Sequence, residues 1–308
     1  MKIGIIGCGA MGSVYASFFS NYDFEVSVYD KWKEHTNKIT STGLKITGPK
    51  LNKKLKTIQV VQNIKSLKNE DLIIIATKIE SLNSVCSQLK QIPNSKTQFL
   101  FIQNGIGSIP IIKKYLSNFF IGVAEGFGAS IIKPGHVHHN SMRQIRIGHL
   151  KKNKTKEIST IVQLWKKAGF NVNKYEDINQ LIWEKFLCNV FLSAPCTAFE
   201  CTIGDLINSK HKLSIAKGCL MEAYRLGLKY NINFSFKNPV SYGLKFAKLM
   251  PKAKPSMYLD FLNRKKSEID YINGAVATLS KKKGLSAPYN ETLTEIIKTK
   301  EKSFLKIR

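Results

Sequence analysis

The chain has 308 residues and a formal net charge of +27, from 48 basic and 21 acidic side chains. Because 43% of its residues are hydrophobic and 22% are charged, the composition excludes a disordered chain and leaves room for two globular domains. No apolar run approaches the roughly 18 residues of a membrane span, and the short, glycine-broken start lacks the pattern of a secretory leader. We therefore expect a cytoplasmic protein.

The excess of lysine is spread along the whole chain. Residues 1–150 carry 19 basic and 8 acidic side chains, and residues 151–308 carry 29 and 13. Nearly all the basic side chains are lysine, whereas arginine is the residue that recognises bases and phosphates through two parallel hydrogen bonds. The charge thus predicts a lysine-rich solvated surface that attracts anionic small molecules, without a membrane or nucleic-acid partner. A polyanion-binding protein is the alternative.

The first 30 residues carry the clearest motif. The apolar run 2–6 predicts a strand, residues 13–20 predict a helix, and residues 24–30 predict a second strand that ends on Asp30. Between the first strand and the helix lies a G-x-G-x-x-G motif at residues 7–12. A glycine motif in this β-α-β context is typical of dinucleotide binding.

Each glycine of the motif has a physical reason. Gly7 permits a tight turn, Gly9 lets the backbone approach a pyrophosphate, and Gly12 lets the helix pack on the strand. The start of the helix then offers unpaired N–H groups to the phosphates. We expect the cofactor to contact the whole loop, which comprises Gly7, Cys8, Gly9, Ala10, Met11 and Gly12.

Strand signals recur through the first half of the chain and then nearly vanish. Further strands are predicted at 72–76, 98–102, 120–124, 143–148 and 171–175, with a helix at about 156–168. From Ile178 onward helical periodicity dominates, with interruptions expected at Pro195, Pro239, Pro251 and Pro255. The sequence therefore predicts an α/β Rossmann domain at 1–176, with a mostly parallel doubly wound sheet, followed by an all-α domain at 177–308.

The second half holds few polar residues with a catalytic pattern. Lys185, Asn189 and Ser193 recur every four residues in an apolar stretch, so they share one face of a helix. A lysine there either has a specific role or extends its ammonium group into solvent. Taken alone, Ser256 is best explained as a helix N-cap and Glu268 as a solvated charge.

The cysteines and neighbouring histidines give little support to a metal or redox site. The six cysteines form no C-x-x-C pair and lie mostly among apolar residues, which favours core positions. His136, His138 and His139 have no cysteine or acidic residue close by in the sequence. We therefore expect no metal site.

An ordered set of short motifs extends through nearly the whole chain. It comprises Gly7-x-Gly9-x-x-Gly12, Lys78 after an apolar strand, Gln103-Asn104-Gly105, Gly128-Ala129, Pro134-Gly135-His136-Val137, Trp183-x-Lys185-x-x-x-Asn189, Pro255-Ser256-Met257, Glu268-Ile-Asp-Tyr-Ile-Asn-Gly274 and Ala287-Pro288-x-Asn290. In this order and spacing the sequence resembles the ketopantoate reductase family of oxidoreductases. The resemblance implies reduction of 2-dehydropantoate to (R)-pantoate by NADPH, on the route to pantothenate and coenzyme A.

The resemblance also implies roles for individual residues. Lys185 corresponds to the family's general acid, which protonates the ketone oxygen as hydride arrives at the carbon. The implied substrate-binding residues are Asn104, Lys185, Asn189, Ser193 and Ser256. The implied cofactor contacts, besides the glycine loop, are Lys31, Lys78, Asn104, Ala129 and Glu268.

Two departures from the family pattern leave alternatives open. Ser193 stands where the family usually has a second asparagine, so a paralogous reductase of another small 2-keto or 3-hydroxy acid is an alternative. Asp30 suits the ribose hydroxyl of NAD, whereas the adjacent Lys31 suits the 2′-phosphate of NADP. We expect NADP(H), with NAD(H) as the alternative, and a homodimer formed through the helical domain. A non-catalytic dinucleotide-sensing protein is the alternative from another class.

Overall fold

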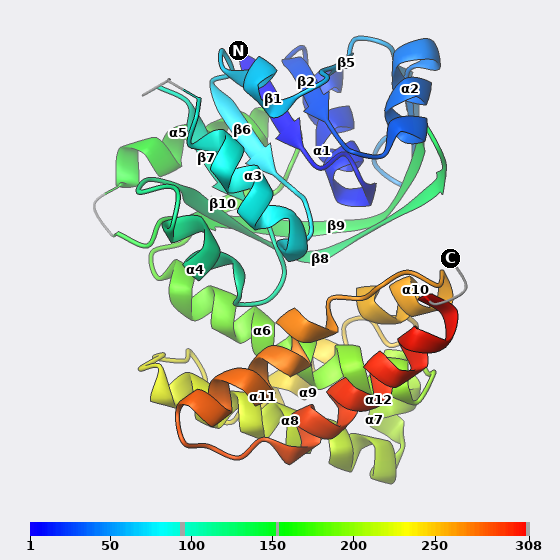
Figure 1. Ribbon diagram of the computed structural model, residues 1–308, viewed down its shortest axis with the longest axis vertical. Coiled ribbons are helices and arrows are strands. Elements are labelled where there is room, and N and C mark those ends of the chain that lie inside the picture. Colours follow the sequence, from blue (N-terminus) through cyan, green and yellow to red (C-terminus); the bar gives the residue numbers. More distant parts are fainter. Residues whose placement is uncertain (93–95, 152–153, 306–308) are drawn as a thin grey trace. The chain divides into compact units, whose positions relative to one another are not determined.

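The computed structural model describes residues 1–92, 96–151 and 154–305 (Figure 1). The chain forms two compact units. One, here called the sheet unit, comprises Met1–Gln103 and Ser108–Ile178, and the other, the helical unit, comprises Asn104–Gly107 and Asn179–Arg308. The domain limits predicted at 1–176 and 177–308 stay a prediction, because compactness alone does not define independently folding domains.

The sheet unit is built on one large sheet. Its strands are β1 (Lys2–Ile6), β2 (Glu25–Tyr29), β3 (Leu44–Thr47), β4 (Lys53–Leu55), β5 (Gln59–Val60), β6 (Leu72–Ile75), β7 (Gln98–Phe101), β8 (Phe120–Lys133), β9 (His136–Gly148) and β10 (Val172–Lys174). The order is β4-β3-β9-β8-β7-β6-β1-β2-β5, with β10 beside β9. All pairs are parallel except β3–β4 and β8–β9, as expected for a mostly parallel doubly wound sheet.

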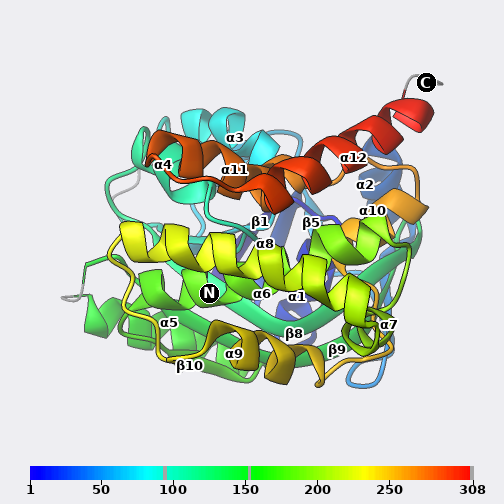
Figure 2. The same cartoon turned by 90° about the horizontal axis from the view of Figure 1, so that it is seen from below.

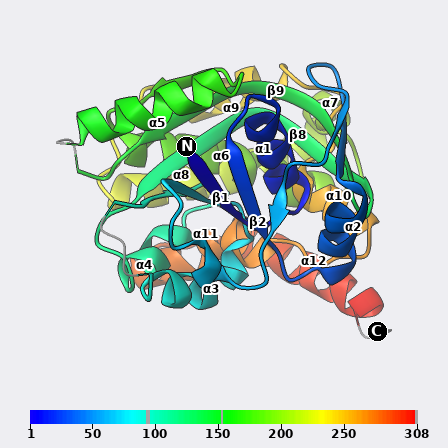
Figure 3. The same ribbon diagram turned by 90° about the horizontal axis from the view of Figure 1, so that it is seen from above.

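Helices cover both faces of this sheet. They are α1 (Ala10–Asn21), α2 (Lys33–Thr42), α3 (Leu82–Leu89), α4 (Ser108–Lys113) and α5 (Thr155–Lys167). Seen from above, α1 and α5 lie on one side of β1, and α3 and α4 lie on the other (Figure 3). Because both faces are covered, the central strands are continuously apolar rather than alternating, which is why β1 and β6 could be recognised in the sequence.

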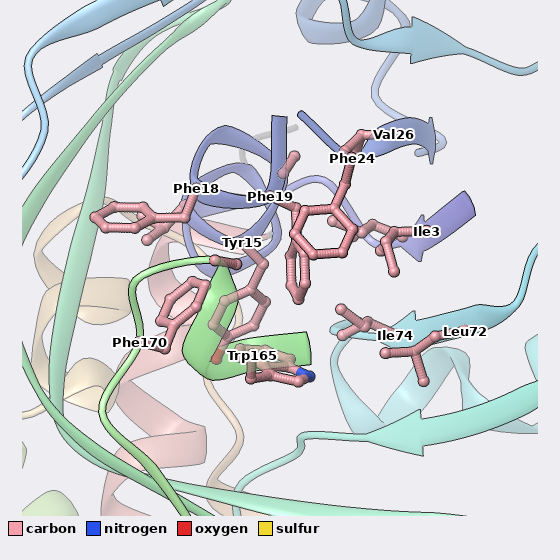
Figure 4. Close-up of a cluster of buried hydrophobic side chains, with 14 of the residues drawn as sticks. Ile3, Tyr15, Phe18, Phe19, Phe24, Val26, Leu72, Ile74, Trp165 and Phe170 are labelled. Carbon is pink, nitrogen blue, oxygen red and sulfur yellow. The ribbon is translucent and has the colours of Figure 1, made fainter. Parts of the chain in front are cut away.

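The core beneath α1 is aromatic (Figure 4). The Trp165 ring of α5 packs edge-on against Tyr15 and Phe19 of α1, with ring centroids 5.1 Å apart in both pairs. Phe170, just after α5, lies 4.8 Å from Trp165 by the same measure. These large side chains fix α1 against the sheet, and the glycine loop at the start of α1 is fixed with it.

The predicted strand at 120–124 is only the first part of a long hairpin. β8 runs from Phe120 to Lys133 and turns at Gly135, where φ is 73°, into the antiparallel strand β9. Residues 120–123 of β8 are buried, whereas residues 124–131 are half-buried. The sequence pattern therefore showed the buried part and missed the remainder.

The helical unit consists of α6 to α12 and a short 3₁₀ turn (Figure 2). The helices are α6 (Ile178–Ala198), α7 (Ile203–Asn208), α8 (Lys210–Lys229), α9 (Pro239–Ala247), α10 (Ser256–Leu262), α11 (Asn273–Lys282) and α12 (Pro288–Leu305), with the 3₁₀ turn at Ile269–Tyr271. The interruption expected at Pro195 is wrong, because α6 continues through this buried residue to Ala198. A proline removes one helical hydrogen bond, and the buried packing of the surrounding turns outweighs that loss here.

A buried polar network connects four helices of the helical unit. The Glu222 carboxylate of α8, 2% exposed, accepts the backbone N–H groups of Tyr289 and Asn290 at the start of α12. The Asn273 side chain of α11 donates to Asn290 Oδ1 and to the Val190 carbonyl of α6. These bonds fix α6 in one position, because leaving such buried groups unpaired is costly. In the described part of the chain, no helix is both long and apolar enough to span a membrane.

Candidate functional site

The residues predicted to bind a cofactor begin with the glycine turn, residues 7–12. Gly7 has φ of 92°, and a Cβ there would lie 2.6 Å from the Thr77 nitrogen. A Cβ at Gly12 would lie 1.8 Å from the Gly7 oxygen, so the helix could not approach the strand. A Cβ at Gly9 would meet nothing within 4 Å. Two glycines are thus required by the fold, and the third leaves an open space.

That open space lies at the start of α1. Gly9 is the N-cap of α1, no side chain caps the helix, and its first turn contains no acidic residue. The first N–H groups and the positive end of the helix are therefore available to an anion. The neighbouring Cys8 is fully buried, and burial raises the pKa of its thiol to about 12, so this cysteine is not a nucleophile.

The predicted cations lie at the same edge of the sheet as the glycine turn. β2 and β6 flank β1 in parallel, so the carboxyl ends of all three strands meet there. Lys31 follows β2 and Lys78 follows β6, and both are exposed. The Asp30 carboxylate accepts the backbone N–H of Trp32 at 2.8 Å. This edge can therefore present both an acid and lysines to a ligand.

Two further residues at this edge were given no role by the sequence. The Gln103 amide donates to the carbonyls of Ile75 and Thr77, at 2.7 and 3.2 Å, and so joins the ends of β6 and β7. Gln103 Oε1 and Thr77 Oγ1 are buried and have no hydrogen-bond partner among the described residues. A polar ligand would offer them partners that the chain does not. Thr77 belongs to no motif, and Gln103 was noted only within Gln103-Asn104-Gly105, because the role of both residues depends on how the strands pair.

Ala129 lies farther along the sheet. It is on β8, which β7 and β6 separate from β1. β8 pairs with β7 only through residues 120 and 121, so Ala129 lies on the part that continues beyond the carboxyl edge. Its pairing opposite His139 follows a register shift in the hairpin. Ala129 and Met11 of the glycine turn both pack against the buried core of the sheet unit.

The candidate catalytic lysine lies on α6 in the helical unit. Between residues 181 and 197 every residue is buried except Lys185 and Asn189, which lie one helical turn apart. Lys185 Nζ donates a hydrogen bond of 2.8 Å to Asn104 Oδ1, which belongs to the same unit. The ammonium group therefore has a specific side-chain partner, as expected of a lysine with more than a solvating role.

The other predicted ligand-binding residues of the helical unit come from three different elements. Ser193 is two turns after Lys185 on α6 and is 4% exposed. Ser256 is exposed and is the first residue of α10, whose N-cap is Pro255, so the predicted N-cap role of Ser256 is wrong. A serine side chain caps from the position before the helix, and the boundary here falls one residue earlier than the sequence suggested. Glu268 is half-buried and directly precedes the 3₁₀ turn.

Comparison with known proteins identifies the family. The family model "Ketopantoate reductase PanE/ApbA" matches residues 3–152, and the model of its C-terminal part matches residues 177–301. The chain belongs to the ketopantoate reductase family. This agrees with the resemblance in the sequence and makes the chain an oxidoreductase with the fold predicted for it.

Full-length relatives carry the same family name. A 2-dehydropantoate 2-reductase from Pyrococcus abyssi is 30% identical over 98% of both chains. One from Streptococcus pyogenes serotype M6 is 28% identical, also over 98% of both chains. The match therefore covers the glycine turn and α6 together rather than one of them.

Solved structures extend the likeness to another activity. A D-mandelate dehydrogenase with NADH and anilino(oxo)acetate is 26% identical, with a TM-score of 0.90 and coverage of 99% of both chains. A PanE/ApbA family ketopantoate reductase from Ralstonia eutropha JMP134 has the same TM-score at 20% identity, with coverage of 99% of this chain and 100% of that one. Within the ketopantoate reductase fold, the overall structure therefore does not select the substrate.

Proposed function

We propose that the chain reduces the ketone of 2-dehydropantoate to the alcohol of (R)-pantoate, with NADPH as the reductant, on the route to pantothenate and coenzyme A. The observation that carries the proposal is the hydrogen bond between Lys185 Nζ and Asn104 Oδ1, where Lys185 is one of two part-exposed residues in the buried stretch 181–197 of α6. The name shared by full-length relatives supports the substrate.

The chemistry needs a hydride donor and a proton donor. A bound reduced nicotinamide supplies the hydride. Lys185 stabilises the negative charge that develops on the ketone oxygen and then donates a proton to it. Asn104 accepts one N–H of the ammonium group and so holds the lysine in a defined orientation. Asn189, one turn further on the same face, would donate to a substrate hydroxyl or carboxylate.

The residues at the sheet edge fit the dinucleotide. The open space at Gly9 and the uncapped start of α1 suit a pyrophosphate. Lys31 and Lys78 would neutralise a 2′-phosphate, which supports NADPH, whereas Asp30 would accept the ribose hydroxyl of NADH. Two cations oppose one acid, and NADPH is therefore the preferred cofactor in this proposal.

A second candidate is the reduction of an aromatic 2-keto acid. It is favoured by the likeness to D-mandelate dehydrogenase at 26% identity, which exceeds the 20% identity to the Ralstonia eutropha ketopantoate reductase structure. Ser193 in place of a family asparagine leaves fewer hydrogen bonds for a substrate hydroxyl, which also favours a different side chain on the keto acid.

The test is to measure oxidation of NADPH and NADH by absorbance with 2-dehydropantoate, phenylglyoxylate and 2-oxoisovalerate. Turnover is expected to be fastest with 2-dehydropantoate and NADPH. Fastest turnover with phenylglyoxylate would replace the proposal by the second candidate. Dinucleotide binding without turnover of any keto acid would favour the non-catalytic sensor.

The Lys185→Met variant tests the proton donor. Turnover should fall by about 10²–10⁴-fold, the usual contribution of general acid catalysis, while the Kd for NADPH changes less than about threefold. Lys282→Met, an exposed lysine at the end of α11, is the matched control and should keep full turnover. An equal loss of NADPH binding in Lys185→Met would mean that the lysine is structural.

A further inference from the structure

A fully buried histidine connects segments that surround the glycine turn. His35 on α2 has no exposed surface. Its Nδ1 accepts the backbone N–H of Gly135 at 3.1 Å, and its Nε2 lies 3.1 Å from Ser13 Oγ. Gly135 is the turn between β8 and β9, and Ser13 lies in the first turn of α1. Three segments that are distant in sequence therefore meet at one imidazole ring.

The hydrogen atoms of this cluster have a single consistent arrangement. Because Nδ1 accepts from Gly135, the neutral ring carries its proton on Nε2 and donates it to Ser13 Oγ. The Ser13 hydroxyl then donates to the Cys8 carbonyl oxygen at 2.9 Å. Burial lowers the pKa of His35, which favours the neutral ring, and the Asp30 charge opposes this effect more weakly.

The series of hydrogen bonds ends within the glycine turn. The Cys8 carbonyl lies between Gly7 and Gly9, the glycine beside the open space at the start of α1. Ser13 is fully buried, and its oxygen lies 3.1 Å from His35 Nε2 and 3.4 Å from Cys8 Sγ, so this hydroxyl joins the histidine to Cys8. The Ser13–His35 bond therefore holds the hydroxyl that donates to the Cys8 carbonyl, next to the start of α1.

The same ring supports the end of β2. Trp32 stacks on His35 with ring centroids 4.7 Å apart and an angle of 16° between the planes. The backbone N–H of Trp32 donates to the Asp30 carboxylate, beside Lys31. His35 thus contacts both the phosphate side and the ribose side of the proposed dinucleotide site.

We propose that His35 is a positioning residue for dinucleotide binding, which holds the glycine turn through Ser13 and the end of β2 through Trp32. The proposal rests on the proposed function, since it requires that the chain binds a nicotinamide dinucleotide. His35 does not touch the substrate in this proposal. Its loss should weaken dinucleotide affinity and leave the rate at saturating dinucleotide largely unchanged.

The test compares variants that remove one or both ring nitrogens. His35→Phe keeps the aromatic stack and removes both hydrogen bonds. His35→Gln places an amide near Nε2 and can keep the bond to Ser13, whereas His35→Asn places one near Nδ1 and can keep only the bond to Gly135. The control is His149→Phe, because buried His149 accepts the Lys151 N–H but does not contact the glycine turn. Kd values for NADPH and NADH come from direct fluorescence titration, kcat from saturating dinucleotide, and folding from Tm.

The expected Kd increase is about tenfold for His35→Phe and for Ser13→Ala, with kcat within about threefold of wild type. The effect of the double variant His35→Phe/Ser13→Ala on Kd should be less than the sum of the two single effects, because both single variants remove the Ser13–His35 bond. His35→Gln should bind better than His35→Asn at similar Tm, and His149→Phe should change Tm without changing Kd.

Three results would overturn the proposal. Folded His35→Gln and His35→Asn variants that both bind like wild type would make His35 purely structural, and so would a Kd increase in His149→Phe as large as that in Ser13→Ala. Additive effects of the two single variants would show that His35 does not act through Ser13. A wild-type chain that binds neither dinucleotide would instead overturn the proposed function, and this inference with it.

Discussion

In the glycine turn, three positions lack side chains for three different reasons. On α6, by contrast, all residues from 181 to 197 are buried except two polar ones, Lys185 and Asn189. The turn depends on the backbone: a positive φ at Gly7, a close helix approach at Gly12 and open space at Gly9. The α6 site depends on a side-chain bond between Lys185 and Asn104. Substitutions should therefore affect folding or dinucleotide binding at the first region and turnover at the second.

The largest expected effect separates two glycines of the same turn. Gly12→Ala places a Cβ 1.8 Å from a backbone oxygen, so the free energy of unfolding should fall by about 3 kcal/mol. Gly9→Ala meets nothing within 4 Å and has φ of −70°, so its stability should stay within about 0.5 kcal/mol of wild type. Urea unfolding measures both.

The two glycine variants should also differ in binding. Folded Gly9→Ala is expected to bind NADPH about tenfold more weakly, because its methyl group occupies the space beside the start of α1. Equal stability loss in both variants would contradict the distinction between a packing glycine and a ligand-facing glycine.

On α6, removing the partner of the lysine should act on catalysis alone. Asn104→Ala removes one acceptor of the Lys185 ammonium group, and hydrogen bonds to charged groups contribute about 1.5–3 kcal/mol, so kcat should fall about 10–100-fold. Tm should change little. Asn263→Ala, at the exposed end of α10, is the control. A large fall in Tm for Asn104→Ala with unchanged kcat would reverse the assignment.

Acid should weaken the two units unequally. His35, His139 and His149 of the sheet unit all accept backbone N–H groups, and burial lowers the pKa of each below 6.5. Below pH 6.5 the unfolded chain therefore binds more protons than the folded chain. The free energy of unfolding then decreases as the pH is lowered, by at most about 1.4 kcal/mol per histidine and pH unit. Burial raises the pKa of Glu70, which acts in the opposite sense nearer its ordinary value of 4.5.

The helical unit contains one histidine, His211, and its side chain is exposed. Hydrogen exchange corrected for intrinsic rates, at pH 7.5 and 5.5, should show lost protection in β1, β8 and β9 and preserved protection in α8 and α12. Equal loss in both units would contradict the prediction. His149→Asn should reduce the difference, because it removes one of the three buried rings that accept a backbone N–H.

The smallest effect concerns cofactor choice at the end of β2. Lys31→Ala should reduce the preference for NADPH over NADH by about tenfold, since one phosphate-facing cation is lost. Asp30→Asn should raise it, although the variant also changes the bond to the Trp32 N–H. The ratio of kcat/KM for the two dinucleotides measures both. An unchanged ratio in Lys31→Ala would move the phosphate contact to Lys78.

The glycine turn could be predicted from the sequence because strand, turn and helix follow one another within 30 residues. The hydrogen bond between Lys185 and Asn104 joins positions 81 residues apart; the family resemblance gave each residue a role but did not indicate this bond. His35 and Gly135 are 100 residues apart, and the sequence gave no sign of their contact. Boundaries were the least predictable feature: α6 continues through Pro195, α10 is preceded by Pro255 rather than capped by Ser256, and β8 extends far beyond its buried start.

The segment Asn104–Gly107 has a consequence for how this chain can be divided. It belongs to the helical unit although its neighbours on both sides belong to the sheet unit. A fragment that begins at Asn179 would therefore contain the lysine of α6 but lack Asn104. A chimera that joins two relatives at a single point near residue 179 would combine Lys185 from one parent with Asn104 from the other. A functional chimera therefore needs residues 104–107 and the helices from the same parent.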